Sequence, residues 1–157
     1  MDEALKQKIV SLLDTHRTMT IATLRPDGWP QTTTVGYGND GLSLYFLCAN
    51  DSQKAANIAR DDRVSIAIND DPVQVMQIKG LSMGARATRV SDQAEGAKAL
   101  NLLFARYPTQ EGITFSLPSP DEVAIFRVTP TVISVLDYTL GFAHTDFVTC
   151  DTLLAAA

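Results

Sequence analysis

The chain has 157 residues and a mass of 17.0 kDa, which is the size of one domain with a single hydrophobic core. Hydrophobic residues make up 45% and charged residues 20%, as in ordinary globular proteins, and no apolar run reaches the roughly 20 residues of a membrane-spanning helix. The net charge is −5 and no Lys/Arg cluster occurs, which argues against nucleic acid or an anionic membrane as main partner.

The N-terminus and the cysteines add two further expectations. The first residues, MDEALKQKIV, lack the basic and then apolar order of a signal peptide, so we expect a cytoplasmic protein. Cys48 and Cys150 lie far apart without metal-ligand spacing, which predicts buried thiols and no metal site. From the length of the chain, we expect residues 1–157 to form one domain.

The first elements along the chain are a helix and a hairpin. Apolar residues recur at helical spacing over residues 3–15, which predicts an amphipathic helix. The segment MTIATL then predicts a strand, and the turn sequence Pro26-Asp27-Gly28 joins it to a strand that starts near Gln31. Trp29 follows this turn sequence, and we expect it to pack in a core or an interface.

The stretch from Gln31 to Lys54 is the centre of the pattern. It predicts a strand, a turn at residues 39–41, a second strand at residues 42–47, and then a loop leading to a helix. Residues 36–41 satisfy G-x-G-x-x-G, but the last glycine opens a strand and not a helix. A dinucleotide site of the Rossmann type is therefore excluded.

The helix expected at residues 52–60 begins with a possible anion site. Ser52 is a suitable N-cap, and a capped helix start carries free backbone N–H groups with a partial positive charge. Lys54 in the first turn opposes the helix dipole unless an anion lies nearby. Two interpretations stay open, namely a phosphate site and a solvated lysine.

The rest of the chain predicts more antiparallel strands and one more helix. Strands are expected at residues 63–69, 73–90 and 123–137, with bulges or close backbone approach at Gly80 and Gly84. Asp92 and Glu95 have capping-box spacing before a helix that Pro108 ends. Residues 108–121 are long enough for a lid or an interface arm, and the tail after residue 138 is irregular but expected to pack. Short turns between the strands favour an antiparallel barrel, closed or split.

The order of these elements from Met19 to about Val148 resembles the pyridoxamine-phosphate-oxidase-like family, the FMN-binding split barrels. The matching pieces are the strand Thr32–Val35, the turn Asp40-Gly41 followed by LYF, the S-x-K helix start with Asn57-Ile58 and Asp62-Arg63-Val64 after it, Gly80, and the ending LDYTLGFAHTD. The resemblance implies a mainly β (α+β) fold, a six- to seven-stranded antiparallel split β-barrel with flanking helices. It also implies a homodimer whose FMN sites lie in clefts between subunits.

The resemblance also implies roles for individual residues. The strand beside the flavin ring and ribityl chain would be Thr32, Thr33, Thr34 and Val35, and Leu47 and Cys48 would line the same cleft. The FMN phosphate would be held by Ser52, Gln53 and Lys54. The partner subunit would contribute Gln74 or Gln77, together with residues near Phe142 and His144.

Two departures from the family pattern bear on the substrate. The vitamin B6 oxidase has basic residues at both ends of the flavin-facing strand, where this chain has Thr32 and Tyr37. Its arginine- and histidine-bearing C-terminal segment has no counterpart after Arg127. Pyridoxamine phosphate is therefore not the expected substrate.

Three classes of function follow. The first is an FMN-dependent oxidoreductase acting on a small molecule, in which the flavin does the chemistry and the protein supplies position and electrostatics. His144 with Asp146 is then a possible proton-donor pair. The second class is a non-catalytic protein that binds flavin, the deazaflavin F420, or haem through His16 or His144. The third class is a split-barrel dimer without a cofactor.

Overall fold

The structure is a computed structural model that describes residues 2–107 and 122–150. The loop expected to act as a lid or arm, residues 108–121, lies outside the described residues. Within the described ranges, no helix has both the length and the apolar character needed to cross a membrane.

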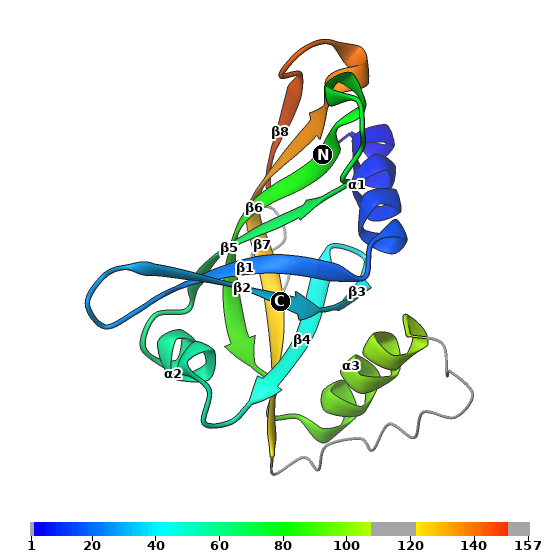
Figure 1. The fold of residues 1–157 in the computed structure, drawn as a ribbon. Helices are drawn as coiled ribbons and strands as arrows, with labels where there is room; N and C mark the ends of the chain where they lie inside the picture. Colours follow the sequence, from blue (N-terminus) through cyan, green and yellow to red (C-terminus); the bar gives the residue numbers. More distant parts are fainter. Residues whose placement is uncertain (1, 108–121, 151–157) are drawn as a thin grey trace.

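The described chain consists of eight strands, three α-helices and two short 3-10 turns (Figure 1). The helical elements are α1 Glu3–Thr15, α2 Gln53–Arg60, α3 Gln93–Ala105, η1 Val75–Gln77 and η2 Tyr138–Leu140. The strands are β1 Thr18–Leu24, β2 Pro30–Gly36, β3 Gly38–Asp40, β4 Ser43–Ala49, β5 Arg63–Asn69, β6 Lys79–Arg89, β7 Val123–Asp137 and β8 Thr145–Thr149.

All strands belong to one antiparallel sheet in the order β2-β1-β5-β6-β7-β4-β3, with β8 added to β7. The long strand β7 pairs with β6 along one edge, and with β4 and then β8 along the other. The sheet curls into a half-barrel flanked by the three helices (Figure 1). The predicted mainly β split barrel with flanking helices is confirmed, as is the strand at residues 123–137.

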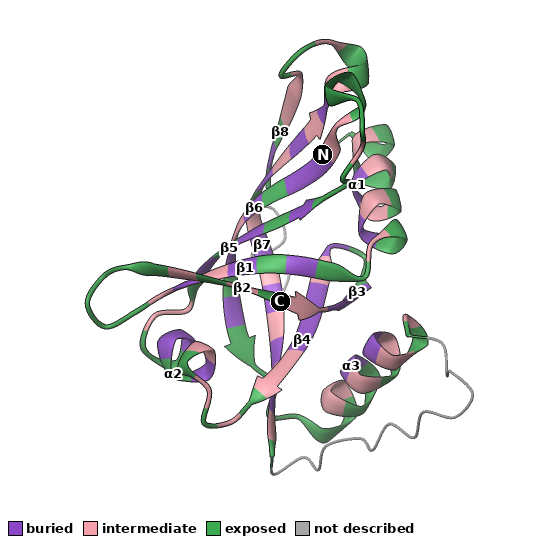
Figure 2. Cartoon of the chain, in the orientation of Figure 1, coloured by how far each residue is buried: buried purple, intermediate pink, exposed green. Residues whose placement is uncertain are grey.

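The core lies on the concave side of the sheet. Side chains alternate in and out along a strand, so β5 buries Val64, Ile66 and Ile68 and exposes the residues between them. The amphipathic helix α1 adds Ile9 and Leu13, both fully buried, as its apolar spacing predicts. Figure 2 shows the resulting alternation of buried and exposed residues along the strands.

The stretch between β2 and β4 differs from the prediction. β2 pairs with β1 over its full length, with Gly28 at φ 84° in the turn, so the first hairpin is confirmed. The predicted second hairpin is shorter, because Tyr37 interrupts the strand and only β3 pairs with β4. Tyr37 is fully buried and its hydroxyl donates to the Leu13 carbonyl at 2.7 Å. This residue turns inward toward α1, and Gly41, at φ 58°, takes the turn position after β3.

The strand predicted at residues 73–90 is wrong in its first third. β6 begins at Lys79, and η1 precedes it. The neighbouring strand β5 ends at Asn69, so no described strand is available for residues 73–77 to pair with, although their apolar alternation is strand-like. The glycine predictions are confirmed, because the register shifts after Gly84, and a Cβ on Gly80 would lie 2.7 Å from the Ile68 carbonyl oxygen.

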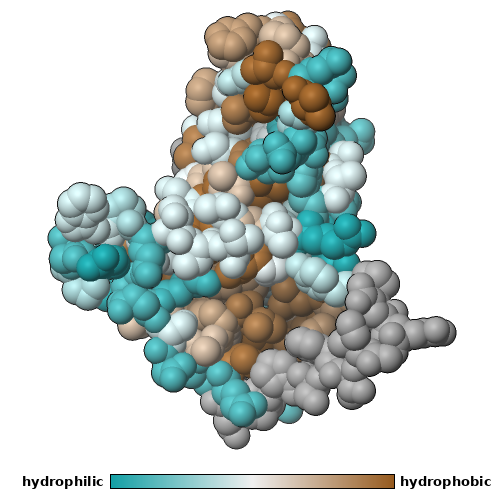
Figure 3. All heavy atoms as spheres, viewed as in Figure 1, coloured by the Kyte–Doolittle hydropathy of each residue, from teal (hydrophilic) through white to brown (hydrophobic). Residues whose placement is uncertain are grey.

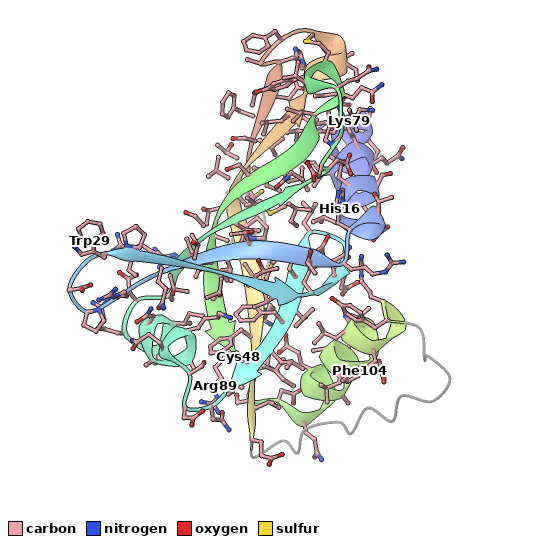
Figure 4. The ribbon with its side chains drawn as sticks, in the orientation of Figure 1. His16, Trp29, Cys48, Lys79, Arg89 and Phe104 are labelled. Atoms are coloured by element: carbon pink, nitrogen blue, oxygen red, sulfur yellow. The ribbon has the colours of Figure 1, made fainter. Side chains whose placement is uncertain are left out.

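Two smaller predictions are also resolved. The tail after residue 138 was expected to pack, and this is confirmed, because it contains β8, which pairs with β7. The expectation that this tail is irregular is wrong for β8. Trp29 lies at the tip of the β1–β2 hairpin with 70% of its surface exposed (Figure 4). Core packing of Trp29 is therefore wrong for the single chain.

Candidate functional site

The start of α2 has the features of an anion site. Ser52 caps the helix, and its hydroxyl oxygen accepts a hydrogen bond from the backbone N–H of Ala55 at 3.2 Å. The first turn contains no acidic residue. The other N–H groups of this turn have no partner within the helix, and the helix dipole makes their surroundings positive.

Lys54 adds a formal positive charge to this helix start. Its side chain is half-buried, and Nζ lies 5.9 Å from the centre of the Phe46 ring on β4. Burial lowers the pKa of Lys54, and the nearby Cys48 thiol opposes this shift. Within residues 2–107 and 122–150, no carboxylate forms an ion pair with Lys54. The charge is therefore not neutralised by the described chain.

Gln53 takes a different part than its position suggests. Its side-chain amide donates to Asn57 Oδ1 at 2.9 Å, one turn along the same helix. Only the backbone N–H of Gln53 is therefore presented at the helix start. Of the three residues predicted to hold a phosphate, the structure brings together one hydroxyl, one ammonium and the backbone of the first turn.

The β2 residues divide between the two faces of an edge strand. Thr32 and Thr34 are exposed on the outer face, whereas Thr33 and Val35 are half-buried on the inner face. Among the described strands, β2 pairs with β1 alone, so half of its backbone polar groups point away from the sheet. The hydroxyl oxygen of Thr33 is buried and has no hydrogen-bond partner in the described chain.

The remaining predicted cleft residues lie on β4, which contacts β2 without pairing with it. Leu47 and Cys48 are both half-buried there, one or two residues beyond Phe46. Below the β1–β2 hairpin, Figure 3 shows apolar side chains in a hollow over β4 and β7. Cys48 lies near the end of β4 (Figure 4), and its thiol is close enough to Lys54 to act on its charge. The β2 edge, β4 and the start of α2 therefore surround one region of the molecule.

The residues predicted to come from a partner subunit lie elsewhere. Gln74 and Gln77 are exposed in and beside η1, not on the long strand as predicted. Phe142 is 75% exposed, and His144 Nε2 lies 3.3 Å from Asp146 Oδ2. The η1–η2 end and α2 are at opposite ends of the molecule (Figure 1). Within one chain, the structure does not bring these residues to the α2 site.

Two residues near α2 were missed by the sequence reasoning. Arg89 ends β6, and its Nη2 donates to Asn50 Oδ1 at 2.6 Å, in the loop that leads into α2. Arg89 and Cys48 lie on the two strands that flank β7, where they pair with Phe126 and Ala124 (Figure 4). Asn57 is fully buried on the inner face of α2. It could have been found from the sequence, because a residue three positions after Lys54 lies on the same side of a helix as Lys54. No local pattern marks Arg89.

Comparison with known proteins agrees with this architecture. A conserved hypothetical protein from Mycobacterium tuberculosis superposes with a TM-score of 0.73 at 26% identity, over 96% of this chain and 94% of that one. A Clostridium acetobutylicum protein related to general stress protein 26, of the pyridoxinephosphate oxidase family, superposes with a TM-score of 0.71 at 13% identity, over 98% of this chain and 99% of that one. A haem-binding protein from Mycobacterium smegmatis superposes with a TM-score of 0.73 at 19% identity, over 99% of this chain and 62% of that one.

Sequence comparison gives the family. A search of curated proteins yields no match. The family profile for pyridoxamine 5'-phosphate oxidase, in contrast, matches residues 5–137, which include every described strand except β8 and the whole of the candidate site around α2. The chain therefore belongs to the pyridoxamine 5'-phosphate oxidase family.

Proposed function

We propose that this chain binds FMN and acts as a flavin-dependent oxidoreductase on a small molecule. The observation that carries the proposal is the half-buried Lys54 at the N-terminus of α2, which no described carboxylate neutralises. A cation that is partly removed from water, at the positive end of a helix, gains most from a bound anion. The phosphate of FMN supplies that anion.

The other predicted residues fit a flavin that extends from this phosphate site. Thr32, Thr33, Thr34 and Val35 offer the open edge of β2, and the unpartnered hydroxyl of Thr33 is a polar group that a ligand could satisfy. Leu47 and Cys48 offer a less polar wall on β4. When bound, the flavin supplies the redox chemistry, while these residues bind it, orient it and exclude water.

Haem binding is the second candidate, because a relative in structure, the Mycobacterium smegmatis protein, binds haem. His16 is poorly placed as an axial ligand. Its Nδ1 lies 2.7 Å from the Leu12 carbonyl oxygen and its Nε2 lies 2.9 Å from Asp70 Oδ1, so both ring nitrogens are engaged. His144 contacts Asp146 through Nε2, and its Nδ1 has no partner among the described residues, so His144 is the remaining imidazole for this role. The deazaflavin F420 would use the same phosphate site.

We also propose a homodimer that forms through the outer face of the sheet. The strand register places two rows of side chains across this face from β2 to β8, and none of them is charged. The rows are Thr34, Thr20, Ala67, Ser82, Ser134 and Phe147, and Thr32, Ala22, Ser65, Gly84, Val132 and Thr149.

Two arguments support a second copy of this chain on that face. Sheet faces in contact with water usually carry charged residues, whereas small uncharged side chains allow another surface to approach closely. Each copy has a net charge of −5, so contact through uncharged faces avoids like-charge repulsion. Sedimentation would find a dimer for the native protein and a monomer for Ala67→Arg, and an unchanged mass for this variant would reject the face.

The cofactor proposal is tested by spectroscopy and by matched lysine variants. The purified protein is titrated with FMN and with riboflavin, which lacks the phosphate, by following flavin fluorescence. Lys54→Met should weaken FMN binding about tenfold or more and leave riboflavin binding almost unchanged. Lys98→Met, which removes a lysine paired with Asp40 at 2.5 Å far from α2, is the control.

The same titrations distinguish the alternatives. A native protein that binds FMN no more tightly than riboflavin contradicts the phosphate assignment. A haem titration that gives a Soret band, with affinity insensitive to Lys54→Met and lost in His144→Ala, supports the haem function instead. Absence of any binding supports the dimer without a cofactor.

A further inference from the structure

A buried amide network connects α2 to the two strands beside it. Asn57 is fully buried, and its Nδ2 donates to Thr23 Oγ1 on β1 at 2.9 Å and approaches Gln31 Oε1 on β2 at 3.4 Å. Its Oδ1 accepts from Gln53 Nε2 at 2.9 Å. One side chain therefore contacts β1, β2 and the first residue of α2 at the same time.

This network fixes the orientation of the Asn57 carboxamide. A carboxamide has two N–H donors and one carbonyl acceptor, and here both ends have partners. Rotation of the group by 180° would place its oxygen against Gln31 Oε1, an acceptor that Asn57 now donates to. Buried amides with satisfied partners specify one arrangement of the elements that they join.

The other end of α2 is attached to the same hairpin. Arg60, in the last turn, donates through Nη2 to the carbonyl oxygens of Leu24 at 2.7 Å and Arg25 at 2.6 Å. Asn57 and Arg60 thus anchor the helix at two points to β1 and β2. Because Arg60 is exposed and Asn57 is buried, Asn57 provides the anchor that solvent does not compete with.

We infer that Asn57 is a positioning residue for the cofactor phosphate, an inference that rests on the proposed function. Lys54 lies one turn before Asn57, and Thr32 follows Gln31 on β2. The network therefore sets where the anion-binding turn of α2 stands relative to the strand proposed to run beside the flavin. Asn57 does not contact the phosphate; it holds the N–H groups and the ammonium at the place where one ligand reaches both α2 and β2.

The test compares FMN with riboflavin, because a positioning role affects the phosphate interaction selectively. Asn57→Leu removes the network, and Thr23→Val, which keeps the shape of the side chain, removes only its β1 partner. Ile58→Ala is the matched control, since Ile58 is a buried neighbour on α2 outside the network. All variants are first checked for native circular dichroism and cooperative unfolding.

The expected result is a loss of selectivity for FMN over riboflavin. Thr23→Val should reduce the FMN/riboflavin affinity ratio about threefold, and Asn57→Leu about tenfold, whereas Ile58→Ala leaves the ratio unchanged. Equal losses for both ligands in the network variants would show a merely structural role and overturn the inference. If Asn57→Leu does not fold, Thr23→Val decides. A native protein that does not prefer FMN overturns the proposed function and the inference together; a preference that survives in the network variants overturns only the inference.

Discussion

Two cations lie over aromatic rings in this molecule, and their surroundings differ. Arg106 stands after α3 with its guanidinium carbon 5.1 Å from the centre of the Tyr37 ring, and Lys54 Nζ lies 5.9 Å from that of Phe46. Both cations are attracted to the ring face in the same way. The ring contact alone therefore does not distinguish a structural cation from one that binds a ligand.

The number of other partners does distinguish them. Arg106 donates to the carbonyl oxygens of Leu13, Asp14 and His16, which lie at the C-terminal end of α1, and to the side chain of Asn39 on β3. These carbonyls have no partner within a helix, and the helix dipole makes them negative. Lys54 has no such acceptor in the described chain. The described chain therefore supplies several hydrogen-bond acceptors to Arg106 and none to Lys54, so the ammonium of Lys54 is available to a ligand.

Removal of Arg106 should give the largest effect on stability. Arg106→Ala removes the donor to the Asp14 and His16 carbonyls and one of the two donors to the Leu13 carbonyl. It also removes the contact with the buried Tyr37 ring, so we expect a loss of about 2 to 4 kcal/mol. Lys54→Met keeps an apolar chain against Phe46, and it should change stability by less than about 0.5 kcal/mol. Urea denaturation measures both values. Similar losses in the two variants would contradict the view that Arg106 stabilises the fold through its acceptors and that Lys54 does not.

The hydroxyl of Tyr37 donates to one of the carbonyls that Arg106 also contacts, and its removal should have an intermediate effect on stability. Tyr37→Phe removes the hydroxyl that donates to the Leu13 carbonyl at 2.7 Å and leaves Arg106 as the other donor to this oxygen, and we expect a loss of about 1 to 2 kcal/mol. Thermal unfolding at pH 7 measures this change. A matched Tyr107→Phe variant, whose hydroxyl donates at 2.8 Å to the Arg17 carbonyl from an exposed position, should lose less. Equal losses would mean that burial does not strengthen the Tyr37 contact.

Alkaline pH tests the same residue. Burial raises the pKa of Tyr37 from 10.0 to about 12, despite the opposing charge of Arg106. The folded protein keeps the proton more tightly than the unfolded chain, so stability is full below pH 10 and falls as the pH rises toward 12. Absorbance at about 295 nm should show Tyr37 ionising late, beside Tyr45, whose pKa is also raised by burial and by Glu95. In Tyr37→Phe, the part of the late transition that belongs to Tyr37 and the matching part of the pH dependence should both be absent.

The sequence was sufficient to predict most of the fold, because alternating burial and turn chemistry are local signals. The pattern of β5, the Pro26-Asp27-Gly28 turn and the spacing of α1 all depend on residues close together in the chain. The errors arose where a distant partner decides. Tyr37 leaves the line of β2 because α1 accepts its hydroxyl, and residues 73–77 are no strand because β5 has already ended.

The candidate site shows the same division. The helix start at Ser52 and the unusual position of Lys54 were visible locally, since capping and dipole arguments need only a few neighbouring residues. Whether Lys54 has a partner, and that Gln53 turns back to Asn57, depends on three-dimensional contacts. Arg89 comes from the end of β6, and only the pairing of β6 in the sheet brings it to the loop before α2.

Arg89 gives the smallest of the expected effects and sharpens the comparison further. It is exposed, and its contact with Asn50 Oδ1 at 2.6 Å holds the loop before α2 while leaving part of its charge in water. Solvent and salt screen such a charge, so Arg89→Gln should weaken FMN binding only two- to threefold, and less at high ionic strength. Riboflavin binding should not change.

The matched control for this last variant is Arg86→Gln, which removes an exposed arginine from the same strand, paired with Asp62 at 2.6 Å. Its effect on FMN binding should be negligible, because its charge is already neutralised. An effect of Arg89→Gln as large as that of Lys54→Met would mean that the exposed cation makes the main phosphate contact. The half-buried, unneutralised Lys54 would then no longer define the site, and the β6 end would replace the start of α2 as its centre.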